Sequence, residues 1–114
     1  MAFARQRRDR APLDEDQLME YALKSLGARM QSVRDLRRKL LDRAEPGQSG
    51  EETADRILNK LKELRYMSDE RYAADFTRLR QENRSFGRRR VQQDLQQKGI
   101  AADVIQTALS DAYD

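Results

Sequence analysis

The 114 residues contain no cysteine and no histidine, which excludes disulfide cross-links, thiol nucleophiles, imidazole bases and the commonest zinc ligands. Apolar residues make up 38% of the chain and charged residues another 38%, so the hydrophobic core is expected to be thin. The net charge is +3, and no apolar run reaches the length of a signal sequence core or a membrane span, so we expect a cytoplasmic protein.

The first predicted elements are a basic arm and a capped helix. Residues 1–12 are rich in arginine and show no hydrophobic periodicity, which predicts a flexible arm. Asp14 is then a suitable N-cap, and Gln17 lies three residues later as its capping-box partner. A first helix is therefore expected to begin directly after Asp14.

The second and third helices have the same kind of start signal. Ser32 is the predicted N-cap of the second helix, with Asp35 three residues later. Three apolar side chains share one stripe of this helix: Val33, Leu36 and Leu40. Residues 45–50 contain one proline and two glycines and predict a loop, after which Ser49, paired with Glu52, is expected to cap the third helix.

The pattern then begins again. Ser68 is the predicted N-cap of a fourth helix, and the segment Gly87–Ile100 repeats the second helix at a shift of about 55 residues. Gly99 is expected to end the fifth helix in the left-handed conformation that glycine adopts at low cost. The sixth helix matches the third at a shift of about 48, so the difference of about seven residues predicts a loop insertion within 45–51.

The sequence therefore predicts an all-α protein built as a tandem repeat of a three-helix unit. Its six helices are expected in an elongated, right-angled or curved arrangement. The predicted division is a basic flexible arm at 1–12, a first repeat at 13–65 and a second repeat at 66–114. Units of this size bury little core alone, so they are expected to lean on each other.

The basic residues gather in three segments. Residues 1–12 hold four basic residues and one acidic residue, residues 32–43 hold five and two, and residues 87–98 hold four and one. Such grouping favours an acidic or polyanionic partner. Three arginines in the first turn of the fifth helix also oppose the helix dipole, which suggests function. The candidate partner-binding residues are Arg34, Arg37, Arg38, Arg88, Arg89, Arg90 and Lys98.

Catalytic chemistry finds little support in the sequence. The acidic residues lie at helix starts or at salt-bridge spacing, as Arg90 and Asp94 do, which explains them without a catalytic or metal-binding role. Gly47 and Gly50 are isolated, and no phosphate-binding loop follows them. We expect no enzyme activity, no metal and no cofactor. Four aromatic residues are expected to pack in the core rather than to stack on bases: Tyr21, Tyr66, Tyr72 and Phe76.

Three segments in order, Gln31–Leu40, Leu61–Ala73 and Gly87–Ile100, resemble the motifs of the RecX family, bacterial regulators of the RecA recombinase. The resemblance covers the chain from Leu13 onward. Two departures stand out: Arg65 replaces a glycine that is common at the junction, and the sequence ends at Asp114 where members commonly continue into a third repeat. The resemblance thus describes a short form with two of the usual repeats.

The resemblance implies an all-helical binding protein rather than an enzyme. Family members bind RecA, lodge in the groove of its filament on DNA, and restrain ATP hydrolysis, strand exchange and co-protease activity in DNA repair, recombination and the SOS response. The expected partners are therefore RecA and the RecA–DNA filament, with a weak direct DNA contact as an additional expectation. We expect no membrane partner and a monomer.

Two other functions stay open from the sequence. A helical DNA-binding module could place one arginine-rich helix in the major groove. The presence of Asp35 in the first turn of the second helix counts against such a reading helix. The third alternative is a structural fragment of a larger adaptor, which predicts binding to neither DNA nor RecA.

Overall fold

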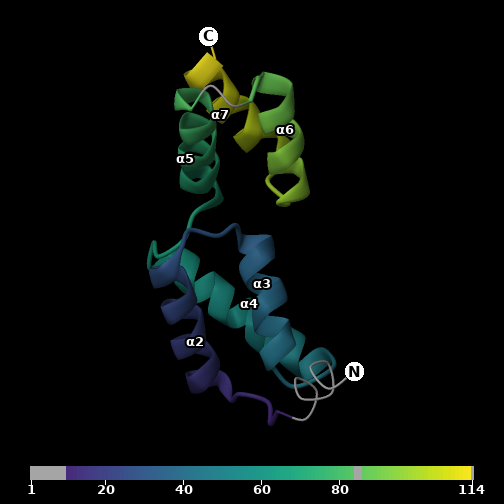
Figure 1. The fold of residues 1–114 in the computed structure, drawn as a ribbon. Coiled ribbons are helices and arrows are strands. Elements are labelled where there is room, and N and C mark those ends of the chain that lie inside the picture. The colour runs from purple at the N-terminus through teal and green to yellow at the C-terminus, as the bar shows by residue number, and fades with distance from the viewer. Residues whose placement is uncertain (1–9, 84–85, 114) are drawn as a thin grey trace.

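The structure is a computed structural model that describes residues 10–83 and 86–113. These residues form six α-helices and no β-strand, which confirms the predicted all-α class (Figure 1). Most of the predicted arm, residues 1–9, lies outside the described residues. The helices are α2 (Glu15–Ala28), α3 (Val33–Arg43), α4 (Gln48–Glu63), α5 (Asp69–Glu82), α6 (Arg88–Gln97) and α7 (Ala102–Tyr113).

The helices pack in two groups of three. In the first trio α2, α3 and α4 contact one another, and in the second trio α5, α6 and α7 make the same three pairings. Figure 1 shows the two trios at opposite ends of the molecule, joined by the segment between α4 and α5. The principal extents are 49 × 36 × 23 Å and the radius of gyration is 16.2 Å, against about 13 Å for a compact chain of this length. The elongated arrangement is therefore as predicted.

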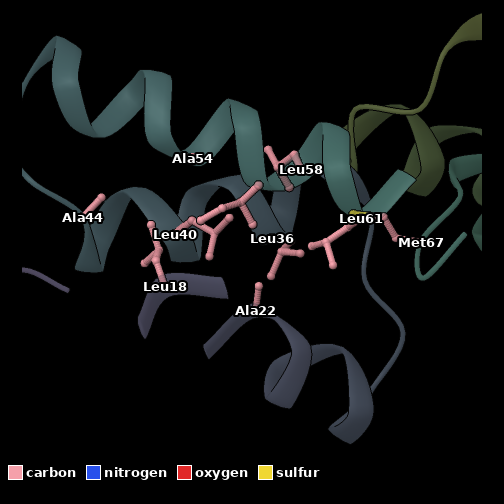
Figure 2. Close-up of a cluster of buried hydrophobic side chains, with 10 residues drawn as sticks. Leu18, Ala22, Leu36, Leu40, Ala44, Ala54, Leu58, Leu61 and Met67 are labelled. Atoms are coloured by element: carbon pink, nitrogen blue, oxygen red, sulfur yellow. The ribbon is translucent and has the colours of Figure 1, made fainter. Parts of the chain in front are cut away.

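Each trio has its own small core. In the first, Leu36 and Leu40 of α3 meet Leu18 of α2 and Leu61 of α4, all fully buried (Figure 2). Met67, which follows α4, packs in the same cluster. The second core is made of Tyr72, Ala73, Val91, Leu95, Ile100, Ile105, Ala108 and Leu109. Neither cluster is large, as expected for units of about 50 residues.

The predicted N-caps of three helices are confirmed. The Asp14 carboxylate accepts the Gln17 N–H at 2.9 Å, and the Gln17 side chain accepts the Asp14 N–H at 3.0 Å, which completes the capping box of α2. The Ser32 hydroxyl accepts a backbone N–H at 3.2 Å at the start of α3, and the Ser68 hydroxyl does the same at the start of α5. These caps depend on residues close in sequence, which is why they could be predicted.

The prediction for the start of α4 is wrong. Ser49 is not its N-cap, because α4 already begins at Gln48, with Gly47 as N-cap at φ 87° and no side-chain cap. The extra residues of the first repeat therefore lengthen the helix instead of forming a loop. Gly50 is the physical reason, since it is buried in the first turns of α4, where the backbone carbonyl of Glu45 packs against its Cα. Gly50, which the sequence predicts in a loop, therefore lies inside a helix and allows the Glu45 backbone to approach closely.

Helices α4 and α6 end in the same left-handed turn. After α6, Gly99 has φ 78° and the Ile100 N–H donates to the Leu95 carbonyl at 3.2 Å, which confirms the predicted C-terminal glycine. After α4, Arg65 takes the corresponding place with φ 62°, and the Tyr66 N–H donates to the Leu61 carbonyl at 2.9 Å. A side chain in this conformation costs about 1–2 kcal/mol, so Arg65 is a strained residue.

Replacing Arg65 with glycine is expected to stabilise the protein. Relief of the left-handed strain gains about 1–2 kcal/mol, and the greater freedom of glycine in the unfolded chain takes back about 0.5–1 kcal/mol. The expected gain is about 1 kcal/mol, or a Tm higher by about 4 °C. Thermal unfolding followed by circular dichroism measures it, and a Tm below that of the unchanged protein would contradict the strain.

One of the four aromatic residues predicted to be buried is exposed. Tyr72 is buried and Phe76 packs beside it, with their ring centroids 5.9 Å apart. Tyr21 packs against the first core. Tyr66, in contrast, is 59% exposed. The left-handed turn at Arg65 accounts for the difference, because it changes the chain direction so that Met67 enters the first core and Tyr66 does not.

Candidate partner-binding surface

Helix α3 carries three of the predicted partner-binding residues, and they differ in their surroundings. The Arg37 Nε donates to the Asp55 carboxylate of α4 at 2.8 Å. The Arg34 side chain packs against Gly99, and its Nη1 lies 3.5 Å from the Gln97 carbonyl oxygen. Arg38 is exposed and makes no hydrogen bond or ion pair with another described residue. Only Arg38 of the three therefore points its full hydrogen-bonding capacity at solvent.

Helix α6 and its C-cap, Lys98, carry the other four, which also fall into different settings. The Arg90 guanidinium lies 4.4 Å from the Phe86 ring centroid, and its Nε is 3.7 Å from an Asp94 carboxylate oxygen. Lys98 pairs with Asp35 of α3 at 3.2 Å. Arg88 and Arg89 are exposed and, within the described part of the chain, without a hydrogen-bonding or charged partner. The N-cap of α6, Gly87, has no side chain that could form a hydrogen bond with either arginine.

We call Arg38, Arg88 and Arg89 the free arginines. They lie on α3 and α6, which follow each other along the same side of the molecule in Figure 1. The C-terminal end of α6 meets the N-terminal end of α3, as the pairing of Lys98 with Asp35 shows. An unpaired guanidinium presents five N–H donors suited to carboxylate or phosphate. The free arginines are thus the part of the predicted set that is available to a partner.

The two trios contact each other in a region that we call the joint. It consists of the first turn of α3 set against the start of α5 and the end of α6. The Val33 N–H donates to Asp69 Oδ1 at 3.0 Å, Lys98 Nζ is 3.2 Å from Asp35 Oδ2, and Arg34 packs on Gly99. Two predicted partner-binding residues, Arg34 and Lys98, are therefore engaged in holding the two trios together.

The pKa values of two aspartates that bind these helices shift in opposite directions: Asp69 lies at the joint, and Asp55 lies within the first trio. Burial raises the pKa of Asp69 above its ordinary value, and the hydrogen bond from the Val33 N–H opposes that effect only in part. The hydrogen bond from Arg37 lowers the pKa of Asp55, and the same bond raises the pKa of Arg37. The Arg37–Asp55 pair is exposed, so its effect on stability is small and decreases with salt.

Sequence reasoning missed the joint. Asp35 and Asp69 read as first-turn acids that favour a helix start, and nothing local shows that each faces a group far away in the chain. Gly99 offered one usable signal, since a glycine at a helix end leaves room for another side chain. Within the described ranges, no cluster of His, Cys, Asp or Glu could hold a metal ion, and no helix could span a membrane.

Replacing Gly99 with alanine is expected to disturb the joint. Alanine would have to keep the left-handed backbone conformation of Gly99, which costs about 1–2 kcal/mol for a residue with a side chain. Its Cβ would also collide with the Arg34 side chain. We expect a loss of about 2 kcal/mol in the free energy of unfolding and, in solution X-ray scattering, a larger radius of gyration than that of the unchanged protein. Gly87→Ala, where the added Cβ meets nothing within 4 Å, is the control. An unchanged scattering profile for Gly99→Ala would show that the joint does not depend on this contact.

The sequence and the structure of this chain are similar to those of known proteins. The family model described as "RecX, second three-helix domain" matches residues 68–109, which cover α5, α6 and most of α7. The chain is also 34% identical over 99 residues to the regulatory protein RecX of Mycobacterium ulcerans (strain Agy99), over 87% of this chain and 55% of that protein. The chain belongs to the RecX family.

Other RecX proteins agree in sequence and in structure. The RecX of Deinococcus radiodurans is 36% identical over 92 residues, which cover 81% of this chain and 41% of that protein. A crystal structure of regulatory protein RecX matches with a TM-score of 0.71 and 26% identity, over 89% of this chain and 54% of the other. The chain thus spans about half the length of the RecX relatives that it matches.

Proposed function

We propose that this RecX-family chain is a non-enzymatic regulator that binds the RecA recombinase and its filament on DNA. In this proposal it inhibits RecA ATP hydrolysis, strand exchange and co-protease activity. Membership of a family of regulatory proteins supports the regulatory role. The observation that carries the proposed mode of binding is that the free arginines have no partner in the described structure and lie on two helices that follow each other along one side.

The seven predicted residues take different parts in this proposal. Arg38, Arg88 and Arg89 contact the partner directly, because nothing in the described chain competes for their guanidinium groups. Arg37 and Arg90 contact the partner at the edge of the binding surface, since each keeps an exposed side chain while paired with an aspartate. Arg34 and Lys98 act through the joint and set the spacing of the other arginines. The proposed repeats, 13–65 and 66–114, then each present one arginine-bearing helix.

An elongated shape suits a filament as partner. Helices of ten and eleven residues, such as α6 and α3, are about 15 Å long each. Placed end to end, they could reach two successive acidic or phosphate groups on a repeating surface. Bidentate contacts from guanidinium groups would give each position charge and geometric selectivity. The long-range part of this attraction decreases as salt rises.

Stepwise addition of the protein to RecA hydrolysing ATP on single-stranded DNA tests the proposal. We expect the rate of ATP hydrolysis to fall with each addition and to reach a plateau when the filament is saturated. Labelled single-stranded and duplex DNA without RecA are the control. Tight, sequence-specific binding to duplex DNA with no effect on RecA would contradict the proposal and favour a DNA-binding module.

A further inference from the structure

A cavity of about 610 Å³ opens where the two trios meet. It lies between the end of α4, the start of α5 and Val33 of α3. Three basic side chains line it, and so do two acidic ones: Lys62, Arg65, Arg71, Asp69 and Glu70. Its size falls within the range of about 300–1,000 Å³ typical of small-ligand sites. The cavity contains none of the residues assigned to the partner-binding surface.

The basic side chains of the cavity are in excess and largely unpaired. Lys62 and Arg65 are exposed, and neither makes a hydrogen bond or ion pair with its side chain to another described residue. Arg71 uses one Nη2 bond, 2.9 Å, to the Arg65 carbonyl oxygen and keeps its other donors. That bond ties the guanidinium of Arg71 to the same turn that displays Arg65. Three cations are therefore gathered around one opening.

The two acidic side chains are already engaged. Asp69 Oδ1 accepts the Val33 N–H at 3.0 Å, and Glu70 Oε2 accepts the Ser68 hydroxyl at 3.1 Å. Neither lies within ion-pair distance of Lys62 or Arg65 in the described structure, and burial raises the pKa of Asp69 more than the charge of Lys62 lowers it. With three cations against two carboxylates, the cavity keeps a positive excess. An entering anion would therefore meet free donors before it met free acceptors.

The backbone of Arg65 provides an independent observation. Its φ of 62° is the conformation that glycine adopts at low cost, and the corresponding turn of the second trio has Gly99. Residues in such strained backbone conformations cluster at binding and catalytic sites, which makes Arg65 a candidate binding residue. Here the strained residue adds a guanidinium to the opening of a cavity that already holds two other cations.

From these observations we propose that the cavity at the joint binds a phosphate group, which Arg65, Lys62 and Arg71 hold. The guanidinium of Arg65 can donate two parallel hydrogen bonds to phosphate oxygens, and the Lys62 ammonium adds a point charge. The phosphate can belong to a nucleic acid strand or to a free polyphosphate such as that of a nucleotide, because both present the same oxygens. This proposal is independent of RecA binding, because the cavity residues differ from the partner-binding residues. Its test contains no RecA, so the two proposals can fail separately.

Calorimetric titration of the full chain at low ionic strength tests this proposal with two probes. One probe is sodium tripolyphosphate and the other is a 12-nucleotide oligothymidylate, which separate the two sources of phosphate. The test variants are Arg65→Gly and Lys62→Gln. Lys60→Gln is the matched control, because Lys60 lies on the same helix and lines the groove between α2 and α4 instead of the cavity.

We expect at least one probe to bind, and each test variant to weaken that binding about tenfold, as the loss of one charge-assisted hydrogen bond predicts. Lys60→Gln should bind like the unchanged protein. Arg65→Gly is informative because it is expected to fold more stably, so misfolding cannot explain its weaker binding. Absence of binding by both probes, or equal weakening by Lys60→Gln, would overturn the proposal. Inhibition of RecA in that case would still stand as a separate result.

Discussion

Replacing Arg88 and Arg89 together with glutamate is expected to abolish inhibition of RecA ATP hydrolysis. Both side chains are exposed and unpaired in the described structure, so the change removes two partner contacts without breaking an internal one. Each reversal also places a negative charge opposite an acidic or phosphate group. Loss of a charge-assisted hydrogen bond costs about 1.5–3 kcal/mol, so two losses predict a decrease in affinity of at least about 100-fold.

The same change should leave α6 intact. Acidic residues in the first turn of a helix interact favourably with its dipole, by about 0.3–1 kcal/mol each, whereas the native arginines oppose it. Circular dichroism should therefore show equal or higher helicity. The matched control is Lys24→Glu with Lys60→Glu, which makes the same change in net charge on α2 and α4. If that control lost inhibition to the same degree, net charge rather than the free arginines would be responsible.

Replacing Gly50 with alanine is expected to destabilise the first trio, although alanine normally favours a helix over glycine by about 1 kcal/mol. The added Cβ would overlap the backbone carbonyl of Glu45, and a backbone atom cannot rotate away as a side chain could. The start of α4 would have to move. Overpacking of this kind costs about 1–3 kcal/mol, so after the helix preference of alanine is subtracted we expect a net loss of about 1 kcal/mol in the free energy of unfolding.

Gly27→Ala is the matched control for this prediction. Gly27 also lies within a helix, α2, and an added Cβ meets nothing within 4 Å. The same substitution should therefore raise stability there, by roughly 0.5–1 kcal/mol. Urea unfolding followed by circular dichroism measures both variants. Effects of the same sign at the two glycines would show that the close approach of Glu45 to Gly50 does not control the start of α4.

Local signals predicted most of the fold. The capping pair of Asp14 and Gln17 and the caps at Ser32 and Ser68 involve residues three apart, so the sequence contains the whole interaction. The left-handed turn at Gly99 was predictable for the same reason. Gly50 was not, because its role depends on where the Glu45 carbonyl lies after the chain has turned.

The candidate site was less accessible to sequence reasoning. The clustering of arginines indicated which helices to consider, but not which side chains the protein uses internally. Arg37 finds Asp55 on the next helix, and Lys98 finds Asp35 across the joint. Both pairings depend on how separate helices pack, within the first trio for Arg37 and across the joint for Lys98, and no residue spacing within one helix indicates them. What distinguishes the free arginines from the others is therefore a tertiary property.

Photo-crosslinking tests most directly whether the arginine-bearing side of the molecule contacts RecA. A benzophenone side chain at Gln93, exposed on α6 one turn after Arg89, leaves every arginine in place. We predict light-induced crosslinks from this position to RecA in filaments on single-stranded DNA, and few from a control probe at Asn59 of α4. Crosslinks from Asn59 with none from Gln93 would contradict the proposed surface.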